Sequence, residues 1–238
     1  MSGRSEKVIR AKIALAATIG LFTLSLCPAL ADDRVGVFGG GQADFSNYVF
    51  IGATLALSPS LGNGLAVRGI LDTGGYNYIN DTLGTVKANF GGGELDALYQ
   101  FTHQNFWSDV GIGVNDTYTG LAPYDPTNRR RGQQAEVRLS LDGGNVSGPW
   151  RADWNGFYGT RLDDYEGRIG LTHALSPQFR LGAEFYAEGD PTYSLYQVGP
   201  VAAIKIADKS ELQFSAGPSW ESGFASRPYF KALIYQSF

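Results

Sequence analysis

The chain has 238 residues, of which 13% are aromatic and 32 are glycine, and its formal net charge at pH 7 is −4. This acidic balance argues against nucleic acid as a partner, because phosphate groups are bound by a basic surface. With one cysteine in the whole chain, an internal disulfide framework is excluded.

The N-terminus has the three parts of a secretory signal peptide. Basic residues from Arg4 to Lys12 precede an apolar run over residues 13–26, and Ala29 and Ala31 then supply a small-residue cleavage site. The apolar run is shorter than the roughly 20 residues that a membrane-spanning helix needs. We therefore predict a cleaved signal peptide over residues 1–31 and one mature domain over residues 32–238. Cleavage would also remove the cysteine, which leaves no thiol for catalysis or for a zinc site.

The mature region alternates apolar and polar residues with the period of two that is typical of β-strands. Within residues 178–188, Leu181 and Phe185 share one face, whereas Arg180 and Glu184 share the other. The sequence predicts twelve strands, near residues 34–44, 46–57, 64–79, 85–101, 105–120, 132–142, 149–162, 164–174, 178–188, 193–206, 210–221 and 227–238.

Strand length and the chain end favour a transmembrane barrel over a soluble β-sandwich. Many runs approach ten residues, and a transmembrane strand needs about 9–11, whereas strands of globular proteins typically have about 5–6. The last run, 227–238, ends on the aromatic Phe238, which we interpret as the strand that closes the barrel against the first. We predict an all-β fold, an antiparallel transmembrane β-barrel of about 12 strands in the bacterial outer membrane, in contact with outer-membrane lipid.

The apolar, aromatic and glycine residues can also be assigned to positions in the predicted barrel. The lipid-facing set is expected to include Val137, Leu139, Ile169, Phe179, Leu181 and Phe185. Aromatic residues near strand ends are interpreted as interface girdles: Tyr48, Trp107, Trp150, Phe179, Trp220 and Tyr229. The glycine runs at residues 39–41 and 91–93 are interpreted as bulges or points of close backbone approach, and not as phosphate loops.

The opposite strand faces are rich in charges of both signs. The candidate lumen charges are Arg138, Arg151, Arg168, Arg180, Glu136, Glu166 and Glu184, with Arg161, Asp153, Asp163 and Glu188 beside them. Two interpretations are open. The charges neutralise one another in a structural network across neighbouring strands, or they line a path or binding surface for a hydrophilic solute.

A loop over residues 119–132 is the most distinctive stretch of the chain. Its candidate residues are Tyr118, Pro123, Tyr124, Asp125, Pro126, Asn128, Arg129, Arg130 and Arg131. The prolines stiffen the loop, the aspartate and asparagine favour turns, and three consecutive arginines concentrate positive charge. The loop is either a solvated connection or a surface that contacts phosphate or anionic polysaccharide, with the two tyrosines available to stack on sugars.

The sequence contains no constellation that is typical of catalysis. The two histidines, His103 and His173, are followed two residues later by Asn105 and Leu175, so neither forms the His-x-Ser pair of barrel lipid hydrolases. Neither follows an aspartate, as in barrel proteases. The acidic run at residues 163–166 lacks the spacing and glycine of a calcium loop. We expect no catalytic residue, no cofactor and no metal site.

Short motifs in the mature chain resemble the BcsS family of cellulose-biosynthesis proteins. The matching blocks include Gly113-Val-Asn, Leu121-Ala-Pro-Tyr-Asp-Pro-Thr-Asn and Phe185-Tyr-Ala-Glu-Gly-Asp-Pro-Thr-Tyr193. Tyr124 stands where the family usually has a second acidic residue. The resemblance implies an outer-membrane protein that is associated with cellulose synthesis and export, and it implies no catalytic residues.

We therefore expect a non-enzymatic outer-membrane β-barrel, an accessory protein in bacterial cellulose biosynthesis or export. Cellulose and other cellulose-secretion components are the expected partners, with no nucleic acid. Two alternatives stay open at this point. One is a small porin or adhesin-like barrel unrelated to cellulose, and the other is a barrel lipid hydrolase with an unfamiliar site.

Overall fold

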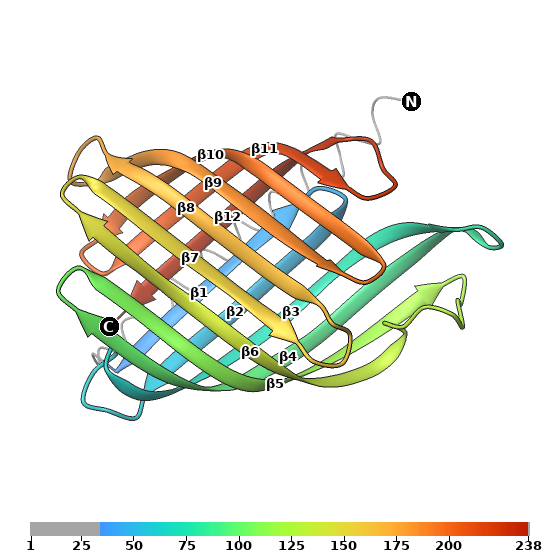
Figure 1. Ribbon diagram of the computed structural model, residues 1–238, viewed down its shortest axis with the longest axis horizontal. Coiled ribbons are helices and arrows are strands. Elements are labelled where there is room, and N and C mark those ends of the chain that lie inside the picture. Colours follow the sequence, from blue (N-terminus) through green and yellow to red (C-terminus); the bar gives the residue numbers. More distant parts are fainter. Residues whose placement is uncertain (1–33, 238) are drawn as a thin grey trace.

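The computed structural model describes residues 34–237, which form twelve β-strands in one closed barrel (Figure 1). The strands are β1 (Val35–Ala43), β2 (Ser46–Ala56), β3 (Gly64–Asn80), β4 (Gly84–His103), β5 (Phe106–Ala122), β6 (Gly132–Ser147), β7 (Trp150–Gly159), β8 (Tyr165–Ala174), β9 (Phe179–Asp190), β10 (Tyr193–Ala207), β11 (Ser210–Glu221) and β12 (Arg227–Ser237). The predicted signal peptide over residues 1–31 and the terminal Phe238 lie outside the described residues. No helix within residues 34–237 is long and apolar enough to cross a membrane.

Each strand pairs antiparallel with its neighbours in the chain, and β1 closes the barrel by pairing with β12. Along this seam Gly36 lies opposite Ser237, and Ala43 lies opposite Phe230. Closure satisfies the backbone groups that an open sheet edge would expose, as a lipid environment requires. The prediction of an antiparallel twelve-strand barrel, closed by its last strand, is confirmed.

The strand ends agree with the predicted ranges to within a few residues, except at β6. This strand was predicted to end at residue 142, whereas it continues to Ser147. A Cβ on Gly143 would lie 2.6 Å from the Trp154 ring, and one on Gly144 would lie 2.6 Å from the Trp107 ring. The two glycines are therefore packing positions against tryptophan rings within the strand, and not the start of a turn.

Apolar side chains cover the outside of the barrel, and polar side chains fill the inside. Ile169, Leu139 and Phe185 are 63%, 49% and 48% exposed, whereas Arg168 and Glu184 are 7% and 3% exposed. The predicted alternation is thus confirmed, and it places an apolar surface where lipid would contact the barrel.

The predicted aromatic girdle is only partly correct. Trp150 and Trp220 are exposed on the outside of the barrel. Tyr48 and Trp107 line the lumen instead, and the Tyr229 hydroxyl, buried inside, donates a hydrogen bond to Glu184 at 3.4 Å. Position within the period of two decides which face a side chain occupies, whether or not it lies near a strand end.

The two glycine runs are points of close approach and not bulges. Strand pairing continues in unbroken register through residues 39–41 and 91–93. A Cβ on Gly40 would lie 2.5 Å from Leu233 and 2.7 Å from the Ala232 carbonyl oxygen. Glycine is required there because any larger residue would collide with the neighbouring strand.

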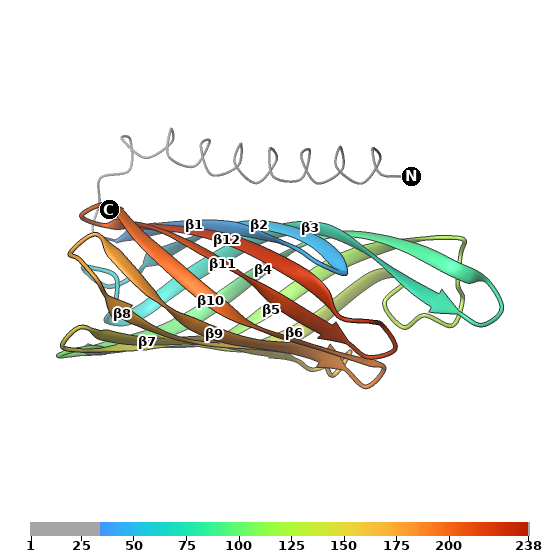
Figure 2. The same ribbon diagram turned by 90° about the horizontal axis from the view of Figure 1, so that it is seen from above.

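The barrel is uneven in height. β3, β4 and β5 have 17, 20 and 17 residues, whereas β1 and β7 have 9 and 10. Figure 2 shows the β3–β4 hairpin projecting beyond the shorter strands. We call this end of the barrel the loop end, because it also carries the β5–β6 loop over residues 123–131. The other end, where β1 begins and β12 finishes, is called the terminal end.

Candidate functional site

A cavity of about 1020 Å³ occupies the lumen and opens at the terminal end. Its lining includes residues 60–62 of the β2–β3 turn and residues 208–210 at the β10–β11 turn, both at the terminal end. Within the described residues, no turn at the loop end contributes to the lining. The lumen is therefore open toward the chain termini and filled by side chains toward the long loops.

The predicted lumen charges lie on the inner faces of β6 to β9, where most of them form ion pairs. Arg138 donates hydrogen bonds to Glu94 at 2.9 Å and to Glu136 at 3.2 Å, and its guanidinium lies 4.1 Å from the centre of the Phe157 ring. Arg168 donates to Glu184 at 2.6 Å. Arg138 thus connects β6 to β4 and Arg168 connects the neighbouring strands β8 and β9, because their side chains share the inner face.

The remaining predicted charges, Arg151, Arg180 and Glu166, also line the cavity. Arg180 donates to Glu211 at 2.5 Å, and Arg151 lies 3.8 Å from the same carboxylate and from Asp153. The predicted lumen charges thus lie on the inner faces of β6 to β9, and their partners extend to β4 and β11.

Two further cations connect strands that are not neighbours. Arg68 on β3 donates to Asp142 on β6 at 2.6 Å and to Asp96 at 2.7 Å. Lys231 on β12 lies 3.6 Å from Glu184 on β9. Removing one partner of such a buried pair costs about 3–5 kcal/mol because a charge is left uncompensated. These contacts connect distant strands of the barrel wall. The sequence signal that could have identified these residues is their inward-facing position in the alternation of each strand.

Arg161 and Asp163 do not face the lumen, so that prediction is wrong. β7 ends at Gly159 and not at residue 162, which places both residues in the exposed β7–β8 turn. Arg161 donates to the Ala135 carbonyl oxygen at 3.4 Å, and Asp163 accepts a hydrogen bond from the Tyr158 hydroxyl at 3.0 Å.

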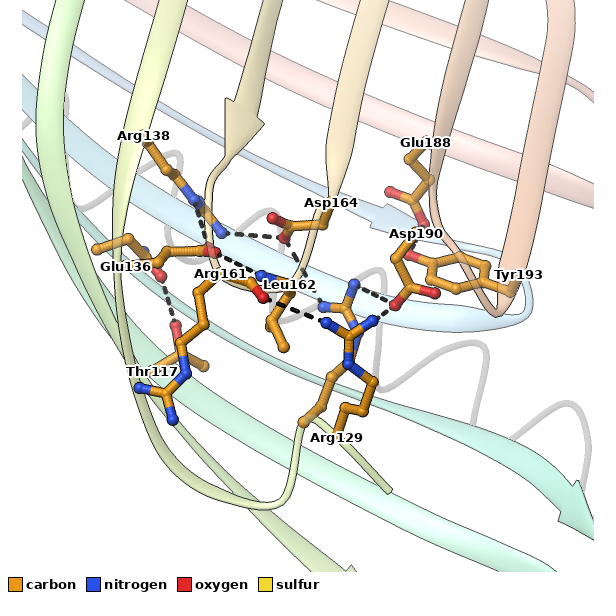
Figure 3. Close-up of polar contacts among 12 residues, drawn as sticks. Thr117, Arg129, Glu136, Arg138, Arg161, Leu162, Asp164, Glu188, Asp190 and Tyr193 are labelled. Atoms are coloured by element: carbon orange, nitrogen blue, oxygen red, sulfur yellow. Dashed lines mark hydrogen bonds and ion pairs between the residues drawn. The ribbon is translucent and has the colours of Figure 1, made fainter. Parts of the chain in front are cut away.

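The three arginines of the β5–β6 loop point to different partners. Arg130 donates to Asp190 at 2.8 Å, lies 3.9 Å from Asp164 and packs over the Tyr193 ring. Figure 3 shows Asp164, Asp190 and Tyr193 gathered beside this loop. Arg129 donates to the Arg161 carbonyl oxygen at 3.2 Å. We call the Arg130–Asp190 and Arg130–Asp164 contacts the loop latch, since they hold the loop against the β7–β8 and β9–β10 turns.

Arg131 and Asn128 support the conformation of the loop itself. Arg131 donates from its side chain to the Asn128 carbonyl oxygen at 2.9 Å, and the Asn128 side chain accepts from the Arg130 amide at 2.8 Å. The arginines therefore do not form one positive surface. Of the predicted sugar-stacking residues, Tyr118 and Tyr124 are 63% and 66% exposed.

Asp125 is the centre of a second set of contacts between this loop and the β3–β4 hairpin. Its carboxylate accepts from the Thr127 hydroxyl at 2.6 Å, from the Tyr78 hydroxyl at 2.8 Å and from the Asn80 amide at 3.0 Å. These hydrogen bonds, led by that of Thr127, lower the pKa of Asp125 to about 2. Asp125 is thus ionised at neutral pH and anchors the loop to the hairpin.

An aromatic row follows the inner face of β1 to β4. Its members, in order of ring contact, are Phe38, Phe50, Tyr48, Phe90, Tyr76 and Tyr78, with successive ring centres 5.5–6.3 Å apart. The row begins in the cavity and ends where the last tyrosine donates to Asp125. Sequence analysis missed it because its members come from four strands.

Metal-ligating side chains are not clustered in the part of the chain that the structure describes. No cluster of three or more His, Cys, Asp or Glu side chains that could hold a metal ion is found among residues 34–237. His173 packs edge-on against Trp150, with ring centres 4.7 Å apart, and His103 is the last residue of β4.

Comparison with known proteins supports both the fold and a family. A family model described as cellulose biosynthesis protein BcsS matches residues 36–238. No curated protein matches the chain.

The fold resembles solved bacterial barrels. The KdgM porin in complex with disordered oligogalacturonate is 10% identical, with a TM-score of 0.51 over 85% of this chain and 99% of that one. The β domain of the Bordetella autotransporter BrkA is 16% identical, with a TM-score of 0.51 over 86% and 98%. The translocator domain of NalP from Neisseria meningitidis is 12% identical, with a TM-score of 0.50 over 96% and 98%. At such identities the likeness concerns the fold alone.

Proposed function

Because the chain belongs to the cellulose biosynthesis protein BcsS family, we propose that it is a non-enzymatic outer-membrane accessory of cellulose export. The observation that carries this proposal is the extent of the family match, which runs from residue 36 to residue 238 and so includes the whole barrel except the first residue of β1. The apolar outer surface and closed backbone pairing support a place in the outer membrane.

The lengths of the connections support one orientation in that membrane. Outer-membrane barrels have short periplasmic turns and longer extracellular loops. The longest connection, over residues 123–131, lies at the loop end, and three of the five turns at the terminal end have two residues each. We place the loop end outside the cell and the terminal end in the periplasm, where the cavity would meet material that is about to leave.

The exposed side of the β5–β6 loop is the proposed outer contact surface, for polymer or for lipid phosphate. Tyr124 in the loop and Tyr118 on the adjoining strand β5 offer exposed rings, and the Arg129 side chain is 48% exposed. Arg130 contributes through the loop latch, which fixes the shape of this surface, and not through direct contact.

Deletion of the gene tests the proposal. We expect extracellular cellulose to fall while cellulose synthase activity in isolated membranes stays at its normal level, because the defect lies after synthesis. Complementation with the intact gene should restore the output. Normal cellulose output from the deletion strain would remove the cellulose function and favour the small porin, which the open cavity also suits.

A further inference from the structure

We propose that the lumenal cavity is a binding site for a single uncharged glucan chain, entered from the terminal end. The identity of the sugar rests on the proposed function in cellulose export. Three properties of the cavity support the site itself: its aromatic wall, its balance of charge and its unpaired hydrogen-bonding atoms.

The aromatic wall offers apolar rings to the faces of sugar rings. Phe38, Tyr48 and Phe50 line one side of the cavity, and Trp107 lines it near the terminal end. The rings of Tyr48 and Phe50 are stacked, with planes 26° apart. The C–H faces of a β-linked glucose unit are apolar, so burying them against such rings is favourable.

The balance of charge favours a ligand without charge. The cavity lining contains eight cationic side chains and eight carboxylates, so its formal charge is zero. Several of these groups are already paired with each other, as in Arg180–Glu211 and Arg138–Glu94. An acidic sugar would have to compete for the paired arginines, whereas a neutral polyhydroxyl chain leaves the pairs intact.

Unpaired polar atoms suit hydroxyl groups in particular. Asp72 Oδ1 and Asp153 Oδ2 are buried acceptors, and Arg151 Nε and Arg180 Nε are buried donors, none with a hydrogen-bond partner among residues 34–237. All four residues line the cavity. A sugar hydroxyl both donates and accepts, so a glucan can satisfy donors and acceptors together. Buried polar atoms without partners are costly, which gives such a ligand a source of affinity.

The size of the cavity and its position toward the terminal end are consistent with a chain end or a short segment. A volume of about 1020 Å³ lies at the upper limit of the ~300–1,000 Å³ that is typical of small-molecule sites. Toward the loop end, the lumen is filled by an apolar cluster of Phe45, Tyr186 and Leu195, with Tyr193 and Phe224 packed against it. In this conformation the cavity therefore receives a glucan from the periplasmic side and does not pass it through.

The test is a calorimetric titration of the purified full barrel, folded in detergent, with cellohexaose and separately with hexagalacturonate. We expect saturable binding of cellohexaose and weaker binding of the acidic hexamer. Phe50→Ala should weaken cellohexaose binding roughly two- to tenfold, because one stacking contact is lost. Ile51→Ala is the matched control, since it changes the next residue of β2 on the outer face and should leave binding unchanged.

Heat-modifiable gel mobility shows whether each variant is folded. If Phe50→Ala does not fold, Asp72→Asn serves in its place, since it keeps the side-chain size and loses one buried acceptor. No cellohexaose binding by the wild-type barrel, tighter binding of the acidic hexamer, or equal effects of Phe50→Ala and Ile51→Ala would overturn the inference. A deletion strain with reduced cellulose output but a barrel that does not bind cellohexaose would keep the proposed function and remove this site.

Discussion

Adjacent residues of one strand face two different environments in this barrel, the polar lumen and the apolar outer surface. Phe50 lines the cavity, whereas Ile51, the next residue of β2, lies on the outer surface. The same holds on β8, where buried Arg168 precedes exposed Ile169. On the inner face a charged side chain is stabilised by oppositely charged neighbours, whereas on the outer face it would contact lipid without such a partner. The free-energy cost of introducing a charge therefore depends on whether the position faces inward or outward.

This dependence can be measured with one substitution at two depths. Ile169 lies in the middle of β8, and Ile79 lies near the tip of the projecting β3–β4 hairpin, and the two are 63% and 66% exposed. We expect Ile169→Arg to lower the free energy of unfolding by about 2–4 kcal/mol and Ile79→Arg by about 0–1 kcal/mol, because only the first places a charge deep in lipid. Urea titrations in lipid vesicles would measure both. Equal losses would contradict the membrane position assigned to the barrel.

At the scale of elements, the β5–β6 loop has an internal order that its composition does not suggest. Asp125 ties it to the β3–β4 hairpin, and Arg130 ties it to the β9–β10 turn at Asp190. The loop is therefore held from two sides, at the end of the barrel where the lumen is filled. An element with such contacts opens less readily than a free loop of the same length.

A protease site inserted after Thr127 would report on the loop latch in whole cells. We expect Arg130→Ser to increase the cleavage rate several-fold, because the loop loses its ion pairs with Asp190 and Asp164. Arg131→Ser is the matched control, since the Arg131 side chain donates to the Asn128 carbonyl oxygen within the same loop. Identical cleavage rates in the two variants would show that the latch does not hold the loop.

At the scale of the whole molecule, closure between β1 and β12 depends on close backbone approach. Gly40 faces Leu233 on β12, and a Cβ added there would also meet the Ala232 carbonyl oxygen. Backbone atoms cannot move aside without breaking the seam, so the last strand can dock only if this position stays small.

Valine substitutions at two glycines would test this requirement. Gly40→Val should reduce the folded, heat-modifiable fraction and destabilise the barrel by about 1–3 kcal/mol, as overpacking does. Gly69→Val should be neutral, because a Cβ at Gly69 meets nothing within 4 Å and valine suits a strand. A seam that closes equally well in both variants would contradict the argument.

The sequence by itself determined the strands, their antiparallel order and the face of most side chains. These follow from local information, since the period of two is set by strand geometry and the connections are short. The inward position of Arg138, Arg168, Arg180 and Glu184 could be predicted on this basis. The resemblance to the family also depends on short sequence motifs, which can be recognised without knowledge of the tertiary structure.

Only the tertiary structure decided which inward side chains meet. Arg68 reaches Asp142 across 74 positions of sequence, and Tyr48 contacts Phe90 from a strand that is not its neighbour. Arg130 lies in a loop, where a solvated side chain would be expected, but it binds Asp190. These contacts depend on how register and curvature bring distant strands together around the lumen, and alternation along one strand carries no information about that distance.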